Sequence, residues 1–492
     1  MTDRNKPAPT PYVPPPLQPH RLAVSDGLML YRRLMERVAE ADRKRLRDWD
    51  NLTEPEAIRR RQRELRQRFL DSLGGLPKRT LLNARVTNRF DHAGQTVETI
   101  LFESLPNFYV SAALFLPDPS RHAPPWPGVV VVCGHSEIGK GYDTYYKGCM
   151  LAAHNGMAAL IVDPVDQGER MQIVNPDGSY PLCLMAGHNR LGACATPVGW
   201  STGRFMLWDN MRAIDYLQSR DDIDAGRIGV TGNSGGGTQS SHLVALDDRV
   251  ACAAPSCYIT TYIREMGYKN PPDAEQCIYG QLGYGMDKTE YTFMRAPAPV
   301  RVCAAVHDTL FSIEGARESV ALARTVFERL GAPDAVELLE DDVPHRWSPK
   351  LRTASIEWMN RHLRGADAPF DAPDDLPAPP PPEQLQATPK GQTLLIEGAR
   401  SGYDLVREQA ARLAEARRRR GALSAEDLRT AVRRRAVIRP LAELPAIEAR
   451  CCEEIARPWG EIRKVLFEVE PDRVLPALHY RENPLETNDI NL

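Results

Sequence analysis

Residues 227–238 place one serine inside a glycine-rich turn. Within them, Gly232-Asn-Ser234-Gly-Gly236 matches the pattern G-x-S-x-G. A β-branched run precedes this pattern and small residues follow it, as a sharp strand-to-helix turn with an exposed nucleophilic hydroxyl requires. A phosphate-binding loop is disfavoured, because no Lys-Ser/Thr follows and the spacing G-x-G-x-x-G is absent. The pattern predicts Ser234 as a nucleophile.

A serine nucleophile needs a base, and the base needs an acid that orients it; in this kind of sheet they follow in the order Ser, acid, His. Asp308 comes directly after an expected strand at 300–306, and His345 comes after the next one at 336–339. Because parallel strands end at the same edge of a sheet, we expect both side chains near Ser234. The rival acids are Glu314, Asp341 and Asp342.

The oxyanion that forms on attack needs two hydrogen-bond donors. One is the backbone N–H of Gly235, which follows the nucleophile at the positive end of a helix. The other is expected from the loop Gly134-His135-Ser136 after the strand at 129–133, through the amide of His135 or Ser136. This loop is itself a rival nucleophile site, but Ile138 stands where the pattern needs a second glycine.

Alternating elements are predicted to position these residues. Strands are expected at 129–133, 158–162, 228–230, 250–254, 300–306 and 336–339, and helices at 145–154, 203–218, 236–246, 314–330 and 349–363. Such alternation is typical of a doubly wound, mostly parallel α/β sheet. Two earlier strands, at 97–102 and 109–116, are expected as an antiparallel hairpin at its edge. The interval between 162 and 228 holds about 40 loop-like residues, and loops of that length are often functional.

The flanking segments differ in composition from this core. We expect a disordered Pro-rich arm at 1–22, an N-terminal helical segment at 23–84, the catalytic domain at 85–365, a Pro-rich linker at 366–390 and a helical C-terminal region at 391–492. The helical pattern at 28–73 is predicted as one helix that Gly74 and Gly75 end. Residues 465–478 also echo residues 100–114, so the C-terminal region resembles the start of a second copy of the main domain; chance similarity of two hairpins is the alternative.

The composition excludes several function classes. The 62 Lys and Arg nearly balance the 65 Asp and Glu, and a net charge of −3 gives no reason to expect nucleic acid or a membrane as partner. No apolar run reaches the roughly 18–20 residues of a membrane span. The N-terminus lacks the apolar core of a secretory signal, so a cytoplasmic location is expected. Cysteine spacing gives no CxxC quartet, and we expect neither a metal nor a cofactor.

Several motifs together resemble the α/β-hydrolase superfamily, and more narrowly the bacterial acetyl xylan esterase and dienelactone-hydrolase-like group, over about residues 60–365. They are Gly134-His135, Asp166-Gln-Gly-Glu-Arg170, Trp208-Asp-Asn-Met-Arg-Ala213, Gly232-Asn-Ser-Gly-Gly-Gly237, Asp273-Ala-Glu-Gln276, Asp308 with Phe311-Ser-Ile-Glu-Gly315, and Pro344-His345. The resemblance implies an α/β-hydrolase fold with a Ser-His-Asp triad. Larger members of the group carry two hydrolase units in tandem, so the C-terminal echo is expected to be a truncated second unit.

Other polar and aromatic residues are candidates for the substrate pocket. They are Glu169, Arg170, Asp273, Glu275, Gln276 and Trp347. For Glu169 and Arg170 the alternative is a salt bridge within the loop, and for Trp347 it is packing in the core. Asp209 and Arg212 are three apart on an expected helix, so we expect them to pair with each other.

These inferences predict a serine carboxylester hydrolase, similar to acetyl esterases, that works through an acyl-enzyme. Without an export signal, small acetylated sugars or other small esters are favoured over polymeric xylan. One alternative is a serine peptidase of the prolyl-oligopeptidase type, although no propeller-like repeat precedes the catalytic segment. Another is a non-catalytic hydrolase-fold scaffold that binds partners through its Arg-rich C-terminal helices. The sequence leaves oligomer formation open.

Overall fold

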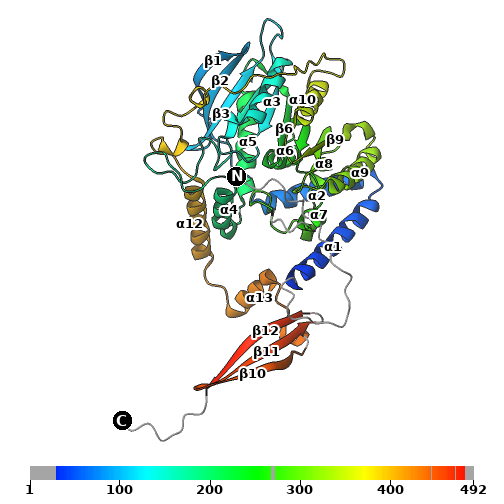
Figure 1. Ribbon diagram of the computed structural model, residues 1–492, viewed down its shortest axis with the longest axis vertical. Helices are drawn as coiled ribbons and strands as arrows, with labels where there is room; N and C mark the ends of the chain where they lie inside the picture. The colour runs from blue at the N-terminus through cyan, green and yellow to red at the C-terminus, as the bar shows by residue number, and fades with distance from the viewer. Residues whose placement is uncertain (1–28, 268–271, 445, 471–472, 483–492) are drawn as a thin grey trace. The chain divides into compact units, whose positions relative to one another are not determined.

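The computed structural model describes residues 29–267, 272–444, 446–470 and 473–482. The chain divides into two compact units, and the described residues 38–414 belong to the first (Figure 1). Of the described residues, the second unit comprises 29–37, 415–444, 446–470 and 473–482. The expected arm at 1–22 lies outside the described residues.

A nine-stranded sheet forms the centre of the first unit. Its strands are β1 (Arg85–His92), β2 (Gln95–Leu105), β3 (Phe108–Leu116), β4 (Trp126–Val132), β5 (Ala158–Val162), β6 (Ile223–Asn233), β7 (Val250–Ser256), β8 (Val300–His307) and β9 (Val336–Pro344). Their order is β1-β2-β3-β5-β4-β6-β7-β8-β9. The pairs β1–β2, β2–β3 and β3–β5 are antiparallel, and the strands from β5 to β9 are parallel. The expected mostly parallel sheet and its antiparallel edge are confirmed.

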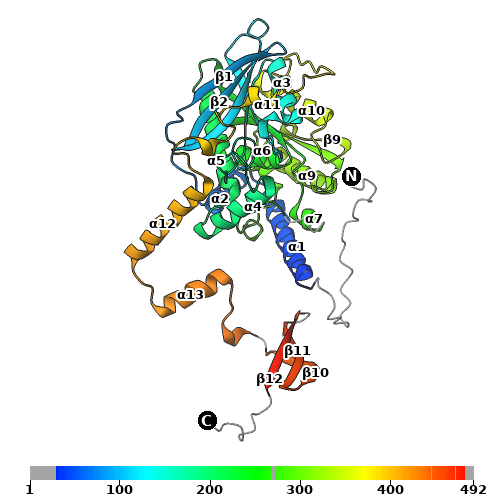
Figure 2. The same cartoon turned by 60° about the vertical axis from the view of Figure 1, so that its left-hand side comes forward.

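Helices cover both faces of this sheet (Figures 1 and 2). The helices of this part of the chain are α2 (Pro55–Ser72), α3 (Asp143–His154), α4 (Leu184–Ala195), α5 (Thr202–Gln218), α6 (Gly235–Leu246), α7 (Tyr262–Gly267), α8 (Glu290–Phe293), α9 (Ile313–Arg329) and α10 (Pro349–Leu363). Alternate β4 residues enter opposite cores: Val130 belongs to the buried cluster that contains side chains of α2, α5, α6 and α9. Val131 packs with α3 and α10. Burial on both faces explains the unbroken apolar run of this strand.

The N-terminal helical segment is two helices rather than the single one expected. α1 (Met29–Asp50) ends before residues 51–54, and α2 begins at Pro55. Proline fits the first position of a helix because its missing N–H is not needed there, whereas inside a helix it removes a hydrogen bond. The left-handed backbone of Gly74 and Gly75, with φ of 77° and 71°, follows the end of α2 as the sequence predicts.

The segment expected as a linker ends inside the first unit. Short helix α11 (Pro382–Leu385) brings Leu385 and Ala387 into buried positions with 3% of their surface exposed. Leu405 and Val406, in α12 (Gly402–Arg420), pack into a third buried cluster with Phe108. The first unit therefore continues well past residue 365, where the catalytic domain was expected to end. None of the helices in the described ranges combines the length and apolar composition needed to cross a membrane.

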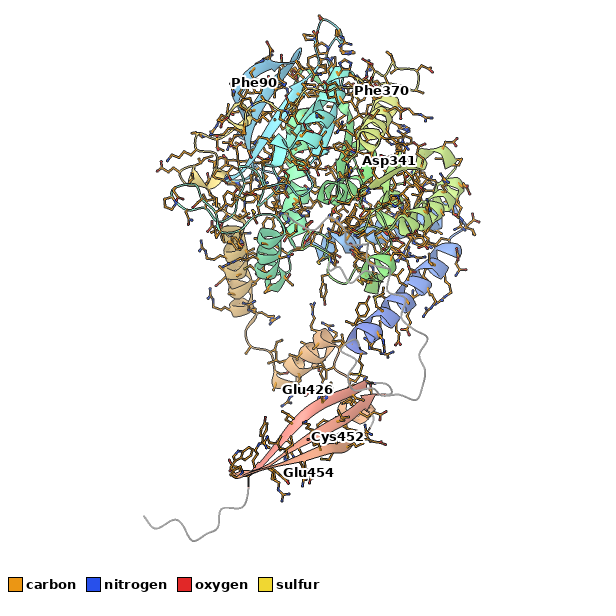
Figure 3. All side chains as sticks on the ribbon, viewed as in Figure 1. Phe90, Asp341, Phe370, Glu426, Cys452 and Glu454 are labelled. Carbon is orange, nitrogen blue, oxygen red and sulfur yellow. The ribbon has the colours of Figure 1, made fainter. Side chains whose placement is uncertain are left out.

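The second unit contains helix α13 (Ala425–Ala436) and a three-stranded antiparallel sheet of β10 (Glu448–Arg457), β11 (Gly460–Glu470) and β12 (Arg473–Glu482). The hydroxyl of Ser424 accepts a 3.1 Å hydrogen bond from the amide of Asp427, which caps α13. Figure 3 labels Cys452 and Glu454 on β10, both of them exposed.

Single 3₁₀ turns lie at Gly139–Gly141, Thr196–Val198, Leu282–Tyr284, Pro333–Ala335, Thr393–Leu395 and Leu441–Glu443.

The strand pairing of this small sheet repeats that of β1–β3. Adding 365 to both residue numbers of every pair in β1–β2 and β2–β3 gives a pair in β10–β11 or β11–β12. Thus Phe102 pairs with Val110, and Phe467 pairs with Leu475. Both register irregularities recur as well, after Val86 and Cys451 and after Glu103 and Glu468. The two sheets are therefore built on one pattern of pairing and bulges.

Candidate active site

Ser234 lies on a strained turn between the end of β6 and the start of α6. Its backbone has φ of 61° and ψ of −122°, which a residue other than glycine rarely adopts. Glycines are needed around it: a Cβ on Gly232 or Gly236 would lie 2.3 or 2.2 Å from the carbonyl oxygen of Val132. The close approach of β4, β6 and α6 thus requires the glycines that the sequence pattern supplies. The turn raises the Ser234 side chain at the carboxyl edge of the sheet.

Asp308 and His345 form a direct pair at the same edge. Each follows its strand immediately, and His307 of β8 is in register with Pro344 of β9. The Nδ1–H of His345 donates a 2.6 Å hydrogen bond to Oδ2 of Asp308. Because an ionised carboxylate only accepts, this bond fixes the tautomer and leaves Nε2 of the ring as the acceptor.

The carboxylate of Asp308 is itself held in place. Its Oδ1 accepts hydrogen bonds from the amides of Leu310 and Phe311, at 2.8 and 3.0 Å, and only 6% of the residue is exposed. The ring of Phe311 packs beside His345 with a centroid separation of 5.7 Å. The backbone amides thus engage Oδ1, and Oδ2 orients the imidazole of His345. Within the described residues, Ser234 Oγ makes no hydrogen bond to His345.

Cys257 lies beside this pair but is a poor rival nucleophile. Its Sγ lies within 4.8 Å of the Asp308 carboxylate and the His345 ring nitrogen. Burial, and then the negative charge of Asp308, raises the pKa of the Cys257 thiol to about 12. It therefore stays protonated at neutral pH, and only a thiolate would be reactive.

The loop after β4 lies directly against the nucleophile turn. A Cβ on Gly134 would be 2.3 Å from the carbonyl oxygen of Asn233 and 3.2 Å from Cβ of Ser234, and one on Gly235 would be 3.3 Å from Cε1 of His135. Gly235 is the first residue of α6, so its amide has no acceptor within the helix. The candidate donors for the oxyanion, Gly235 and the loop of His135 and Ser136, are thus brought together. Ser136 is buried, with 7% of its surface exposed.

His135 belongs to a cluster that also contains His188 of α4 and Glu275. Its Nε2 lies 3.3 Å from Nδ1 of His188 and 3.3 Å from Oε1 of Glu275. Nδ1 of His188 lies 3.5 Å from Oε2 of Glu275, and Asp273 places Oδ2 3.7 Å from Nε2 of His135. His188 has no predicted role from sequence, although it falls in the long interval expected to be functional. No motif or strand end marked it.

Burial and charge act against each other in this cluster. Burial would raise the pKa of the Glu275 carboxyl, but the imidazoles of His135 and His188 hold it well below its ordinary value. Burial would likewise lower the pKa of His188, but the nearby carboxylate of Glu275 holds it above its ordinary value. Asp273 has a raised pKa because of its burial and the nearby charge of Glu275. The cluster is a concentrated polar site next to the nucleophile turn.

Glu169 and Arg170, expected in the pocket, are instead engaged inside the protein. Lys140 Nζ donates to Glu169 at 2.6 Å, and the amides of Ala387 and Thr388 donate to the same carboxylate at 2.8 and 2.7 Å. Arg170 is fully buried and pairs with Asp209 at 2.7 Å. Asp209 therefore does not pair with Arg212 as expected. Both candidate pocket residues hold segments together that are distant in sequence.

Two further candidates also pack into the protein. Trp347 is 3% exposed, and its ring lies 5.8 Å from that of Tyr145, in the core between α3 and α10. Gln276 accepts a 3.2 Å hydrogen bond from Nζ of the buried Lys288. Of the candidate pocket residues, only Asp273 and Glu275 share the neighbourhood of His135.

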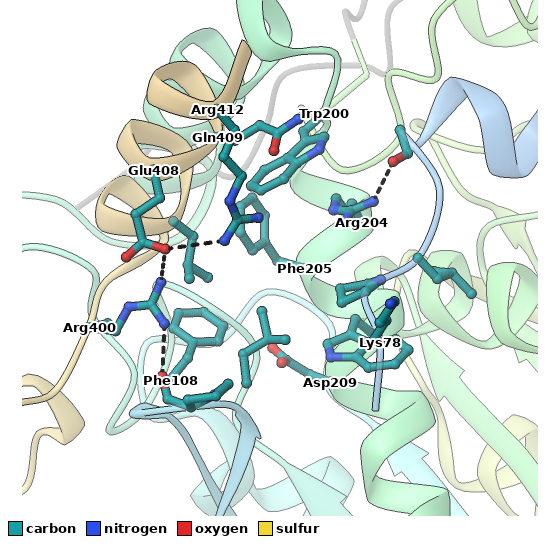
Figure 4. A pocket seen from close by; sticks show the side chains of 17 residues that line it. Lys78, Phe108, Trp200, Arg204, Phe205, Asp209, Arg400, Glu408, Gln409 and Arg412 are labelled. Carbon is teal, nitrogen blue, oxygen red and sulfur yellow. Dashed lines mark hydrogen bonds and ion pairs between the residues drawn. The ribbon is translucent and has the colours of Figure 1, made fainter. Parts of the chain in front are cut away.

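A separate cavity of about 510 Å³ lies away from Ser234 (Figure 4). It is lined by Gly74, Leu76, Pro77, Lys78, Leu105, Pro106, Phe108, Trp200, Arg204, Phe205, Trp208, Asp209, Arg400, Leu405, Glu408, Gln409 and Arg412. None of the catalytic candidates is among these residues, so the cavity is no substrate pocket for Ser234. Arg400, which lines the cavity, forms an ion pair with Glu408 and donates a 3.0 Å hydrogen bond to the carbonyl oxygen of Pro106.

Comparisons with known proteins agree with this architecture. The chain is 24% identical over 312 residues to "Putative hydrolase YtaP" of Bacillus subtilis (strain 168). The aligned region covers 61% of this chain and 99% of that protein. The structure of "Methylesterase BT1017" superposes with a TM-score of 0.58 at 19% identity, covering 77% of this chain and 81% of that one. The structure of a "putative acetyl xylan esterase" from Bacteroides fragilis NCTC 9343 gives a TM-score of 0.48 at 17% identity, covering 58% of this chain and 76% of that one.

No family model matches the chain. The mostly parallel sheet, the helices on both of its faces and the strand-to-helix turn at Ser234 are consistent with the superposition on "Methylesterase BT1017". The protein therefore has the α/β-hydrolase fold.

Proposed function

We propose that the protein is a serine hydrolase of carboxylic esters. One observation carries the proposal: Asp308 holds Nδ1 of His345 across 2.6 Å, at the sheet edge where Ser234 occupies a strained turn with φ of 61°. Strain of this kind is retained where the surrounding structure enforces it, as active sites do. Orienting a histidine with a buried carboxylate serves the proton transfers of acyl transfer.

The proposed reaction has two halves. Ser234 Oγ attacks the ester carbonyl while Nε2 of His345 takes the hydroxyl proton and then delivers it to the departing alcohol. The amide of Gly235 and an amide of the 134–136 loop stabilise the oxyanion, and one such donor is worth about 2.7–4 kcal/mol. Water then attacks the acyl-enzyme, with His345 again as the base, and releases the carboxylic acid.

The favoured substrates are small esters, including acetylated sugars. The motifs around Ser234 and His345 support this class, and a curated relative is named a hydrolase. A superposing structure is named a methylesterase, so methyl esters belong in the same assay. The partly exposed His135 and Asp273 beside the turn suit a polar alcohol or acyl group better than a long alkyl chain.

The decisive experiment uses the whole chain with a Ser234→Ala variant. The wild type is expected to hydrolyse p-nitrophenyl acetate and to be labelled once per chain by a fluorophosphonate, and the variant to do neither. Wild-type turnover that survives in the variant would refute the assignment of Ser234. A panel of p-nitrophenyl esters of increasing acyl length, acetylated oligosaccharides, methyl esters and peptide substrates then ranks the substrates. A peptide preferred over every ester would indicate a peptidase.

A further inference from the structure

Three segments far apart in the sequence bring two imidazoles and a carboxylate to one point. His135 follows β4, His188 lies in the middle of α4, and Glu275 lies in the loop after residue 271. His188 and Glu275 have 0% and 1% of their side-chain surface exposed. Burying a carboxylate is expensive unless a positive charge or several donors compensate it.

The carboxylate of Glu275 lacks that compensation from hydrogen bonds. Both of its oxygens are buried and have no hydrogen-bond partner of acceptable geometry within the described residues. The imidazole nitrogens nevertheless lie only 3.3 and 3.5 Å away. His135 Nε2 and His188 Nδ1 are also within hydrogen-bond distance of each other, so the nitrogens and the carboxylate converge on one point, as ligands of a shared ion do.

The separations match those around a tetrahedral ion. Zinc binds histidine nitrogen and carboxylate oxygen at about 2.0–2.1 Å, so two ligand atoms of a tetrahedral site lie about 3.3–3.4 Å apart. The observed separations are 3.3 Å between His135 and His188, 3.3 Å between His135 and Glu275, and 3.5 Å between His188 and Glu275. The three donors fit three corners of one tetrahedron.

The protonation of His188 also suits a metal ligand. Its Nε2 lies 2.8 Å from the carbonyl oxygen of Val165. A carbonyl only accepts, so Nε2 carries a proton, and Nδ1 is the ring nitrogen that faces His135 and Glu275. Metal-bound histidines almost always donate their other ring N–H in this way, which fixes the ring and its tautomer.

We propose that His135, His188 and Glu275 bind a divalent transition-metal ion of the zinc class. Two nitrogens and one carboxylate oxygen suit Zn²⁺, and the same set accepts Co²⁺. Asp273, whose Oδ2 lies 3.7 Å from Nε2 of His135, stands beside the fourth position. The partial exposure of His135 and Asp273, at 15% and 27% of their side chains, gives the ion a route in.

The ion would hold the loop that faces the nucleophile. The ring of His135 lies against Gly235, and the amides of residues 134–136 are the second source of oxyanion donors. His135 is thereby a positioning residue, held by the ion while its loop faces the reacting atoms. Loss of the ion is expected to lower kcat more than it raises KM, because oxyanion contacts are strongest in the transition state.

Metal stoichiometry tests the proposal without any activity assay. The full chain is stripped with a chelator, and its Zn²⁺ affinity is measured by competition with a chromophoric chelator. One Zn²⁺ per chain at micromolar free ion or below is expected, and the Co²⁺ form should show the strong visible absorption of a four-coordinate site. A folded wild-type chain that binds less than one equivalent at that concentration, or only six-coordinate Co²⁺, would overturn the proposal.

Variants then locate the ion. Glu275→Gln and His188→Asn are each expected to weaken Zn²⁺ binding at least about 100-fold, since even outer partners of metal ligands change affinity 10–100-fold. His307→Gln is the matched control, because His307 and Asp342 form an exposed pair at 2.7 Å elsewhere. Wild-type affinity in folded Glu275→Gln, or lost affinity in the control, would contradict the site. Ser234→Ala should bind Zn²⁺ normally, which separates this proposal from the esterase proposal.

Discussion

Oδ2 of Asp308 accepts the Nδ1–H of His345 at 2.6 Å, while Oδ1 of the same carboxylate is occupied by two backbone amides. The acid therefore cannot turn away from the base without losing both amide bonds. Replacing it by asparagine would present an NH₂ group or a weaker acceptor to Nδ1 and favour the wrong tautomer of the ring.

We expect Asp308→Asn to lower kcat by roughly 10⁴-fold with little change in KM, as the loss of the correct tautomer does in serine proteases. Steady-state kinetics with p-nitrophenyl acetate measure both constants. Asp342→Asn is the control, because Asp342 is exposed and pairs with the exposed side chain of His307. A kcat within ten-fold of the wild type would remove Asp308 from the triad.

Glu169 offers a test between a pocket role and a structural one. Glu169→Gln leaves Lys140 paired with the buried carboxylate of Asp163, but it removes the second ion pair of Lys140 and weakens the bonds that Ala387 and Thr388 donate. Each hydrogen bond to a charged group contributes about 1.5–3 kcal/mol to stability. We expect a lower thermal midpoint with unchanged KM for the folded enzyme. A raised KM at an unchanged midpoint would instead place Glu169 in contact with substrate.

The buried imidazole of His242 predicts sensitivity to acid. Burial lowers its pKa to about 3, from 6.5 in an exposed ring, and it packs between Phe69 and Tyr291. The unfolded chain therefore binds more protons between pH 6.5 and 3, so stability falls as the pH falls through this window. Going from pH 6.5 to 5, this one group costs about 2 kcal/mol.

We expect His242→Phe to remove that loss, so that the variant gains stability relative to the wild type as the pH is lowered. Urea unfolding at pH 7.5 and 5.0, followed by tryptophan fluorescence, measures the difference. His307→Gln, which changes an exposed ring, should leave the pH dependence as it is. Parallel pH profiles for His242→Phe and wild type would show that His242 is not the group responsible.

Two truncations test where the first unit ends. A chain that stops after residue 420 keeps α11, the amides that bind Glu169, and the buried Leu405 and Val406, so we expect wild-type esterase activity. A chain that stops after residue 380 loses all of these contacts and should be insoluble or melt at a much lower temperature. Equal melting of the two chains would return the boundary to the Pro-rich segment.

The catalytic candidates were predictable from sequence because each depends on short-range patterns. The nucleophile turn is encoded by consecutive residues. Asp308 and His345 each follow a strand that is recognisable in the sequence as a short apolar run. Parallel topology then dictates that the ends of β6, β8 and β9 share one edge. The link between Ser234 Oγ and His345 stays a prediction.

The partners of the other polar residues were not predictable in this way. Arg170 pairs with Asp209, 39 positions away, and Glu169 binds amides more than 200 positions away. Local rules such as the three-residue spacing of Asp209 and Arg212 favour near neighbours and miss such pairs. His188 gave no signal because a single histidine on a short helix carries no motif. Its role emerges only when α4 is placed against the loop after β4.

The C-terminal echo was visible in sequence over two strands, whereas the pairing extends it to β10. β10 shares little with β1 in residue type, so its equivalence lies in the bulge after Cys451 and not in an apolar pattern. We propose that residues 448–482 are a second copy of the strands that open the main sheet. The constant shift of 365 through two irregularities supports a duplication over chance similarity.

This equivalence bears on how the edge of the small sheet is protected from pairing with other strands. On β3 of the main sheet, the carbonyl oxygen of Ser111 accepts a hydrogen bond from the amide of Asp163, so this backbone position points away from β2. Its counterpart Pro476 lies on β12, which is an edge strand of the small sheet. A proline there offers no N–H to an incoming strand, and prolines and charges on edge strands are how natural sheets discourage aggregation. We therefore expect Pro476 to hinder strand pairing at this edge, so that Pro476→Val makes the chain self-associate.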